Sequence, residues 1–146
     1  MPELEAIKAA VDHADTPIAE RAQQVAEIVR RTGGFRWVDV YEMTSTEVID
    51  LAWSGPAPPA HPRFPVDRGL TADAVATGRT VACNDVRNNP RYLVALDSTG
   101  SEIIVPVTDA TGEVVGTLDV DSVDLGAFDD ATRHALEAAV ALLPPL

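Results

Sequence analysis

The hydrophobic residues near the start of the chain recur with the spacing of an α-helix. A first amphipathic helix is expected over residues 3–14, and a second one after Thr16-Pro17, a capping residue followed by proline at the first helical position. Gly33-Gly34 marks the end of the second helix, because glycine readily adopts the left-handed conformation that closes helices. The apolar face of the second helix consists of Ile18, Ala22, Val25, Ile28 and Val29.

Further along, the hydrophobic pattern changes to short alternating or continuous apolar runs, which are typical of strands. The expected strands are residues 35–44, 48–53, 80–83, 101–108 and 113–121. The first two form a predicted β-hairpin, and the last two form another with its turn at Asp109 to Gly112, where glycine supplies a positive φ. Two more helices are expected over residues 70–77 and 128–143.

Two long loops interrupt this order. Residues 54–68 contain five prolines, which exclude a helix or a central strand there. Residues 85–100, with Asn88-Asn89-Pro90, form the second loop. Long loops within a compact domain are usually functional or disordered, and the prolines favour a functional loop because they stiffen it. Both loops are expected to act as lids over a pocket.

The order of elements predicts an α+β fold with a central antiparallel sheet of about five or six strands. Helices are expected on one face and the long loops on the other. With 146 residues, 46% of them hydrophobic, the chain has enough apolar material for one core. We therefore expect a single domain over residues 1–146, with N-terminal helices in residues 3–32 and a core in residues 34–143.

Charge and cysteine content narrow the function. The formal net charge of −12 repels phosphate backbones and anionic lipids, which argues against nucleic acid and membranes as partners. The single cysteine, Cys83, excludes an internal disulfide. No apolar run approaches the roughly 20 residues that span a bilayer, and the first residues lack a signal pattern, so a cytoplasmic protein is expected. No metal-binding spacing is present, and no cofactor is expected.

Four segments together resemble a GAF domain. They read GLTADAVATGRTVACNDVRNNP, SEIIVPV, GEVVGTLDVDS and FDDATRHALEAAVALL. More narrowly, they resemble the free methionine-(R)-sulfoxide reductases, a family of small stand-alone homodimers, and the match spans roughly residues 16–143. The resemblance implies a GAF fold and a homodimer formed through the first and last helices. In a monomer of that kind, Val25, Ile28 and Val29 are expected to be exposed.

The resemblance also implies a cage of two aromatic and three acidic side chains. Trp37 and Tyr41 match the W-x-x-x-Y segment of the family, Glu102 matches its S-E-I-V-x-P segment, and Asp119 and Asp121 match L-D-[VIL]-D-S. Carboxylates suit the α-ammonium of a free amino acid, and the rings suit a sulfoxide side chain. Three carboxylates pressed together would repel, and some would take up protons unless a cation lies between them.

The same residues also have ordinary structural interpretations. Trp37 and Tyr41 are typical core residues of an apolar strand. Asp119 and Asp121 flank Val120 in the manner of a strand with one solvated face, and Glu102 is a plausible strand-end residue. The five loop arginines, which are solvated charges or a clamp for a ligand carboxylate, are Arg63, Arg68, Arg79, Arg87 and Arg91.

The chain departs from the reductase family at its thiols. The family's cysteines occupy positions that read His61, Thr71 and Ala95 here, or Leu96 in place of Ala95 if the match is anchored on Asp97. Alanine and leucine cannot attack a sulfoxide, and His61 and Thr71 cannot form a disulfide. Cys83 matches no family position, and it is either a small buried apolar residue or a lone nucleophile recycled by an external thiol.

Three functions therefore remain open from the sequence. The first is a non-catalytic GAF module that binds an amino acid or a related ammonium compound. The second is an enzyme, either a reductase that uses Cys83 or a divergent reaction. A hydrolytic set of His61, Glu102 and Asp121 would lack a nucleophile. The third is a dimeric signalling or interaction module whose pocket is vestigial.

Overall fold

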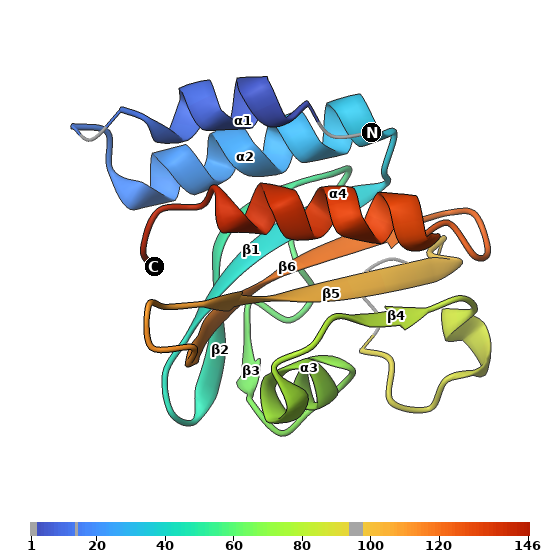
Figure 1. The fold of residues 1–146 in the computed structure, drawn as a ribbon. Helices are drawn as coiled ribbons and strands as arrows, with labels where there is room; N and C mark the ends of the chain where they lie inside the picture. The colour runs from blue at the N-terminus through green and yellow to red at the C-terminus, as the bar shows by residue number, and fades with distance from the viewer. Residues whose placement is uncertain (1–2, 14, 94–97) are drawn as a thin grey trace.

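The computed structural model describes residues 3–13, 15–93 and 98–146 as one antiparallel sheet with helices packed against it (Figure 1). In these residues the helices are α1 (Leu4–Val11), α2 (Ile18–Gly33), α3 (Thr71–Thr77), the short 3-10 turn η1 (Val86–Asn88) and α4 (Asp130–Ala141). The strands are β1 (Trp37–Met43), β2 (Glu47–Ser54), β3 (Arg63–Pro65), β4 (Val81–Cys83), β5 (Ser101–Thr108) and β6 (Val114–Ser122). The predicted α+β class is confirmed.

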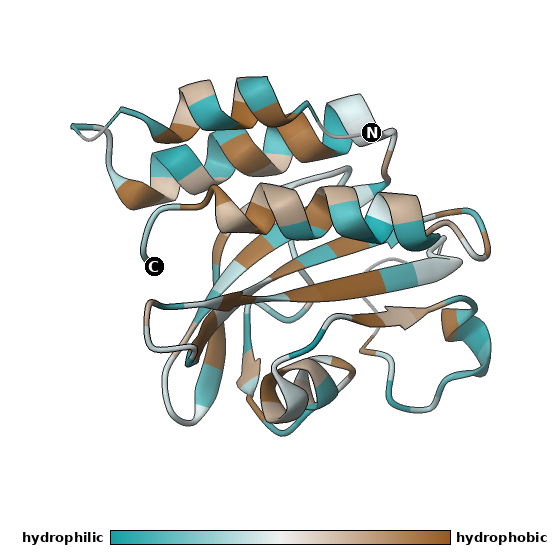
Figure 2. Cartoon of the chain, viewed as in Figure 1, coloured by the Kyte–Doolittle hydropathy of each residue, from teal (hydrophilic) through white to brown (hydrophobic). Residues whose placement is uncertain are grey.

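The six described strands are ordered β3-β2-β1-β6-β5-β4, and every pair of neighbours is antiparallel. Helices α1, α2 and α4 cover one face, while α3 and the described parts of the two long loops lie on the other (Figure 1). Hydrophobic residues run along β5 and β6 beneath α4 (Figure 2). Alternation along the strands therefore gives the sheet two different faces, one for the core and one for the loops.

The core lies between the sheet and the three long helices. Val38 and Val40 of β1 and Leu118 and Val120 of β6 point into it, and all four are fully buried. The side chain of Gln23 joins α2 to the sheet edge: its amide donates to the Trp53 carbonyl at 2.7 Å and accepts from the Trp53 N–H at 3.3 Å. This pair of bonds lies beside the register shift between β1 and β2 at Val40 and Tyr41.

Several predicted helix boundaries are confirmed, and one predicted helix-capping residue is wrong. Gly34 closes α2 with φ 70°, and Asp129 caps α4 by accepting from the Thr132 N–H at 2.8 Å. Thr16 does not cap α2, because Pro17 is the N-cap residue and the Thr16 N–H is bonded to the His13 carbonyl. None of the described helices has the length and apolarity needed to cross a bilayer.

The expectation that the apolar face of α2 is exposed in a monomer is wrong. Val25 and Val29 have no exposed surface, and Ile28 is partly buried against the same core. The reason is that α2 lies between α1 and the sheet, so one chain covers this face without a partner (Figure 1). A homodimer stays a prediction, and these three side chains do not supply its interface.

The proline-rich loop contains a short strand that its composition did not predict. Arg63–Pro65 pairs with β2 at the edge of the sheet, the one place in a sheet where proline is tolerated. Phe64, at the centre of this strand, is buried and packs edge-on against Tyr41, with ring centroids 5.5 Å apart. The loop is thereby held against the face of the sheet that carries the predicted cage.

Candidate ligand site

The register of β1 and β6 aligns polar and aromatic side chains on the loop face of the sheet. Three antiparallel pairs follow one another: Trp37 with Asp121, Asp39 with Asp119, and Tyr41 with Thr117. Residues two apart in a strand point the same way, so all six side chains face the loops. On β5, Glu102 is paired with Asp121 and extends the row.

A small cavity of about 30 Å³ lies between this face and the loops. The residues around it are Trp37, Tyr41, Pro59, Ala60, His61, Phe64, Gly69, Leu70, Thr71, Leu93, Glu102, Ile104 and Asp119. Six of the predicted site residues are therefore gathered at one cavity, which has room for about one water molecule or ammonium group. Asp121 is not among the lining residues.

Asp121 lies beside the cavity and is held by the second loop. Its side chain is fully buried, and one carboxylate oxygen accepts from the Thr99 hydroxyl at 2.9 Å and from the Tyr92 hydroxyl at 3.3 Å. Burial raises the pKa of Asp121 to about 6, while the bonds from Thr99 and Tyr92 oppose this rise. Asp121 thus connects the acidic row to Tyr92 and Thr99 of the second loop. Residues 94–97 of this loop lie outside the described residues.

Asp119 and Glu102 form the acidic wall of the cavity. Asp119 is 5% exposed, and burial raises its pKa to about 8 although a bond with Thr117 opposes the rise. Its Oδ1 atom has no hydrogen-bond partner among the described residues. Burial also raises the pKa of Glu102 well above its usual range, and the charges of Asp121 and Asp119 add to this effect. Both carboxyls would be stabilised as anions by a cation placed between them.

Asp39 is a fourth buried acid on this face, and it was not among the site residues predicted from the sequence. It has no exposed surface, and no N–H group of the described residues donates to its carboxyl, whose side-chain partners are Asp50 and Tyr41. Burial raises its pKa to about 11, with further increases from Asp50 and Asp119. Its position midway between Trp37 and Tyr41 could have identified Asp39 as a site residue, because alternation along a strand puts all three side chains on one face.

Unpartnered polar atoms are concentrated around this row. Among the described residues, those on the loop face are Trp37 Nε1, Asp50 Oδ1, Asp119 Oδ1 and Asp121 Oδ1. Buried polar groups in proteins normally have partners, and leaving one unpaired costs about 1–3 kcal/mol. Apart from Trp37 Nε1, these atoms are carboxyl oxygens, which only accept hydrogen bonds when ionised, so the face is matched to a cationic guest that supplies several N–H donors.

Residues 15–143 match the family model of the GAF domain. The chain belongs to the GAF domain family. It is 30% identical, with a TM-score of 0.86, to the free methionine-R-sulfoxide reductase of Neisseria meningitidis in complex with its substrate, covering 96% of this chain and 83% of that one. A putative GAF sensor protein from Burkholderia vietnamiensis is 26% identical, with a TM-score of 0.85, over 96% of this chain and 87% of that one. The free methionine-R-sulfoxide reductase of Escherichia coli is 27% identical over 86% of this chain and 74% of its own length.

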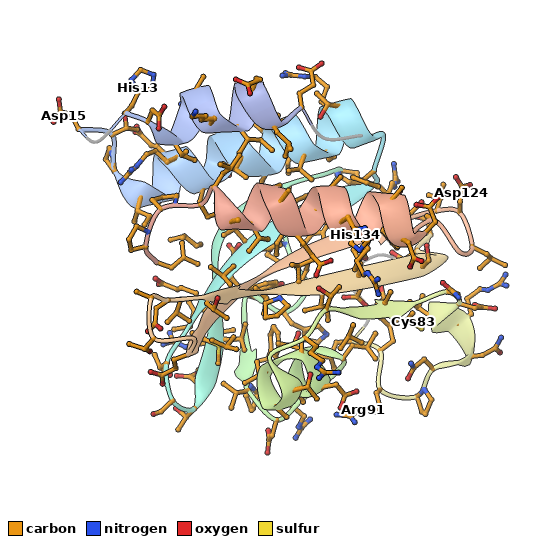
Figure 3. All side chains as sticks on the ribbon, in the orientation of Figure 1. His13, Asp15, Cys83, Arg91, Asp124 and His134 are labelled. Atoms are coloured by element: carbon orange, nitrogen blue, oxygen red, sulfur yellow. The ribbon has the colours of Figure 1, made fainter. Side chains whose placement is uncertain are left out.

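The positions at which the resemblance implies family cysteines hold no cysteine in this chain, whose single thiol is Cys83. Ala95 and Leu96 lie outside the described residues, while His61 and Thr71 border the cavity. Cys83 lies on β4 opposite Glu102, half-buried and outside the cavity lining (Figure 3). Its sulfur accepts from the Asn89 side chain at 3.5 Å.

The loop arginines do not point to a carboxylate clamp. Arg63 pairs with Glu47 at 2.8 Å, Arg87 pairs with Asp85, and Arg91 pairs with Asp73. Figure 3 shows Arg91 at the surface of the molecule. None of the five arginines singled out from the sequence borders the small cavity. The described part of the chain brings no three His, Cys, Asp or Glu side chains together in a geometry that would hold a metal ion.

A wider groove of about 890 Å³ lies on the other side of the GAF domain, between α4, the C-terminal tail and the β5–β6 turn. Its walls are largely aliphatic and proline side chains, and its charged side chains are Arg79, Asp109, Arg133 and Glu137. No buried acid lines this groove. The small cavity is the better candidate because buried titratable groups and aromatic rings converge there.

Proposed function

We propose that this GAF domain binds a small molecule with an ammonium group, a free amino acid or a relative of methionine sulfoxide, without thiol catalysis. The observation that carries the proposal is the cavity in which Glu102 and Asp119 face Trp37 and Tyr41. The likeness to a reductase of Neisseria meningitidis solved with its substrate supports an amino-acid-like guest.

The chemistry of the cavity fits such a guest. An ammonium group has three N–H donors, and Glu102 and Asp119 present carboxyl oxygens that accept charge-assisted bonds. The cation would lower the pKa of both carboxyls, so they would bind it as anions. Trp37 and Tyr41 would pack against the aliphatic or sulfur-containing part of the guest.

The size of the cavity implies that the guest enters with movement of the loops. A volume of about 30 Å³ has room for the ammonium group but not for a whole amino acid. Pro59, Ala60 and His61 of the first loop and Leu93 of the second form part of the wall. We propose that residues 54–68 and 85–100 act as lids that open and reclose over the ligand.

Binding is tested by calorimetry with L-methionine, its R-sulfoxide and the analogue of methionine that lacks the amino group. We expect the amino acids to bind and the deaminated analogue to fail. Glu102→Gln should weaken binding by about 30-fold or more, because removing one partner of a buried charge pair costs at least about 2 kcal/mol. Glu42→Gln is the matched control, since Glu42 faces away from the cavity on β1.

Absence of binding by every amino acid tried would remove this proposal. Equal affinity for methionine and its deaminated analogue would remove the ammonium site in particular.

Reductase activity is the alternative that Cys83 leaves open. In its simplest form, the Cys83 thiolate would attack the sulfoxide sulfur, release methionine and leave a sulfenic acid that an external thiol reduces. We expect no methionine release above background from wild type or from Cys83→Ser when free R-sulfoxide is supplied with dithiothreitol. Release by wild type that is lost in Cys83→Ser would instead establish an enzyme.

A further inference from the structure

Two carboxyl groups on the loop face lie beyond the pair that one ammonium group needs. Asp39 on β1 is paired with Asp119, and Asp50 on β2 is paired with Tyr41, so the acidic row continues across the sheet from β5 to β2. Asp39 is fully buried between Trp37 and Tyr41, two residues that line the cavity. No N–H group of the described residues donates to either of its oxygens, since its side-chain partners are Asp50 and Tyr41, and one buried oxygen of Asp50 has no partner.

One ammonium group cannot donate a hydrogen bond to every carboxyl group of this acidic row. Its three N–H donors would be used by Glu102 and Asp119, which border the cavity directly. Asp39 would still have only Asp50 and Tyr41 as side-chain partners, neither of them cationic, and one buried oxygen of Asp50 would have none. Leaving a buried acceptor unpaired costs about 1–3 kcal/mol, so a row of this length is matched to more than one cationic group.

The groups that face Asp39 from each neighbouring strand supply no positive charge. They are Tyr41 on β1, Asp50 on β2 and Asp119 on β6, and the two acids raise the pKa of Asp39 beyond the effect of burial. The rings of Trp37 and Tyr41 flank Asp39 on either side along the strand. Aromatic faces attract a cation that sits over them, and the effect grows when water is excluded.

We propose that Asp39 and Asp50 form a second cation subsite, and that the ligand of this GAF domain carries two amino groups, as a diamine or a basic amino acid does. This proposal rests on the proposed function, because the first amino group occupies the cavity between Glu102 and Asp119. Neighbouring strands lie about 4.8 Å apart, so the two subsites are on the order of 5–10 Å apart. That is the separation of amino groups at the two ends of a short aliphatic chain.

The test compares L-lysine with L-norleucine, which is the same molecule without the side-chain amino group. Calorimetry on the full chain should show lysine binding about 10- to 100-fold more tightly, because a hydrogen bond to a charged group contributes about 1.5–3 kcal/mol. Asp39→Asn and, separately, Asp50→Asn should reduce this preference and leave norleucine binding within about 3-fold of wild type. Glu42→Gln should change neither affinity.

Cadaverine, which has the two amino groups without the α-carboxylate, serves as the third probe. Tight binding of cadaverine also supports the second subsite and assigns the ligand to diamines. The control Glu102→Gln should weaken all three probes, because it removes the first subsite.

The outcomes separate the two proposals. Equal binding of lysine and norleucine by wild type, or an unchanged preference in both aspartate variants, would overturn the second subsite and leave the proposed function standing. Failure of all three probes, together with methionine, would overturn both proposals. If Asp39→Asn does not fold, the second subsite is still tested by Asp50→Asn and by the comparison of lysine with norleucine in wild type.

Discussion

Asp119→Asn is expected to stabilise the unliganded protein and to remove most of its ligand affinity. Burial raises the pKa of Asp119 to about 8, and its Oδ1 atom has no partner, so the carboxylate form is costly in the absence of a cation. An asparagine amide has the same shape, no charge, and two N–H donors among many acceptors. We expect a gain in unfolding free energy of about 1–3 kcal/mol at pH 9. Binding should weaken by about 30-fold or more.

The measurement is urea unfolding at pH 9 together with calorimetric titration of whichever amino acid binds wild type. Glu113→Gln is the control, because Glu113 is exposed and lies just before β6. A variant that is more stable than wild type but binds the ligand more weakly would show that Asp119 serves ligand binding. A destabilised variant with unchanged affinity would show that Asp119 has a structural role.

The unliganded protein is also expected to lose stability as the pH rises from about 5 to 9. Burial raises the pKa of Asp121 to about 6, of Asp119 to about 8 and of Asp39 to about 11. The folded protein therefore keeps protons that the unfolded chain has released above pH 4. Each such proton lowers the unfolding free energy by about 1.4 kcal/mol per pH unit until the folded pKa is reached.

This dependence has the opposite sign to that of an acid stabilised by a salt bridge. Urea unfolding from pH 5 to pH 9 is expected to show a falling stability for wild type and a flatter curve for the double variant Asp39→Asn/Asp119→Asn. Saturating ligand should also flatten the curve, since a bound cation favours the ionised carboxyls. A wild-type stability that rises toward pH 8, or a double variant with the same slope, would contradict this interpretation.

Much of the fold could be predicted because local pattern and final structure agree. The helix capped by Gly34 and the strands around Val38 and Val120 follow directly from the spacing of apolar residues and from the glycines that end helices and form turns. The strand at Arg63–Pro65 could not be predicted, because proline permits an edge strand but only the exposed edge of β2 makes one form. The burial of Val25 and Val29 likewise depends on how α1 packs, which spacing along α2 does not show.

The candidate site was predictable to a similar degree. Resemblance to a known family selected Trp37, Tyr41, Glu102 and Asp119, and the structure places all four around one cavity. Asp39 was missed because the resemblance gave it no role, although alternation alone places it on the same face as its neighbours. A list of family residues thus overlooks a buried acid to which the resemblance assigns no role.

The partners of Asp121 were beyond the reach of sequence. Thr99 and Tyr92 belong to a long loop without a repeating pattern, and their approach to Asp121 depends on the path of that loop in three dimensions. The same holds for the pairing of Arg91 with Asp73 across the loop and α3, which removes this arginine from the set of candidate ligand contacts.

The most direct test of the account is a crystal structure of the chain soaked with L-lysine. The account predicts density between the loops and the sheet, with the α-amino nitrogen within hydrogen-bond distance of Glu102 and Asp119 and the rings of Trp37 and Tyr41 along the chain of the ligand. Density with the ligand carboxylate against those acids, or an unaltered cavity at a lysine concentration that saturates binding in solution, would contradict it.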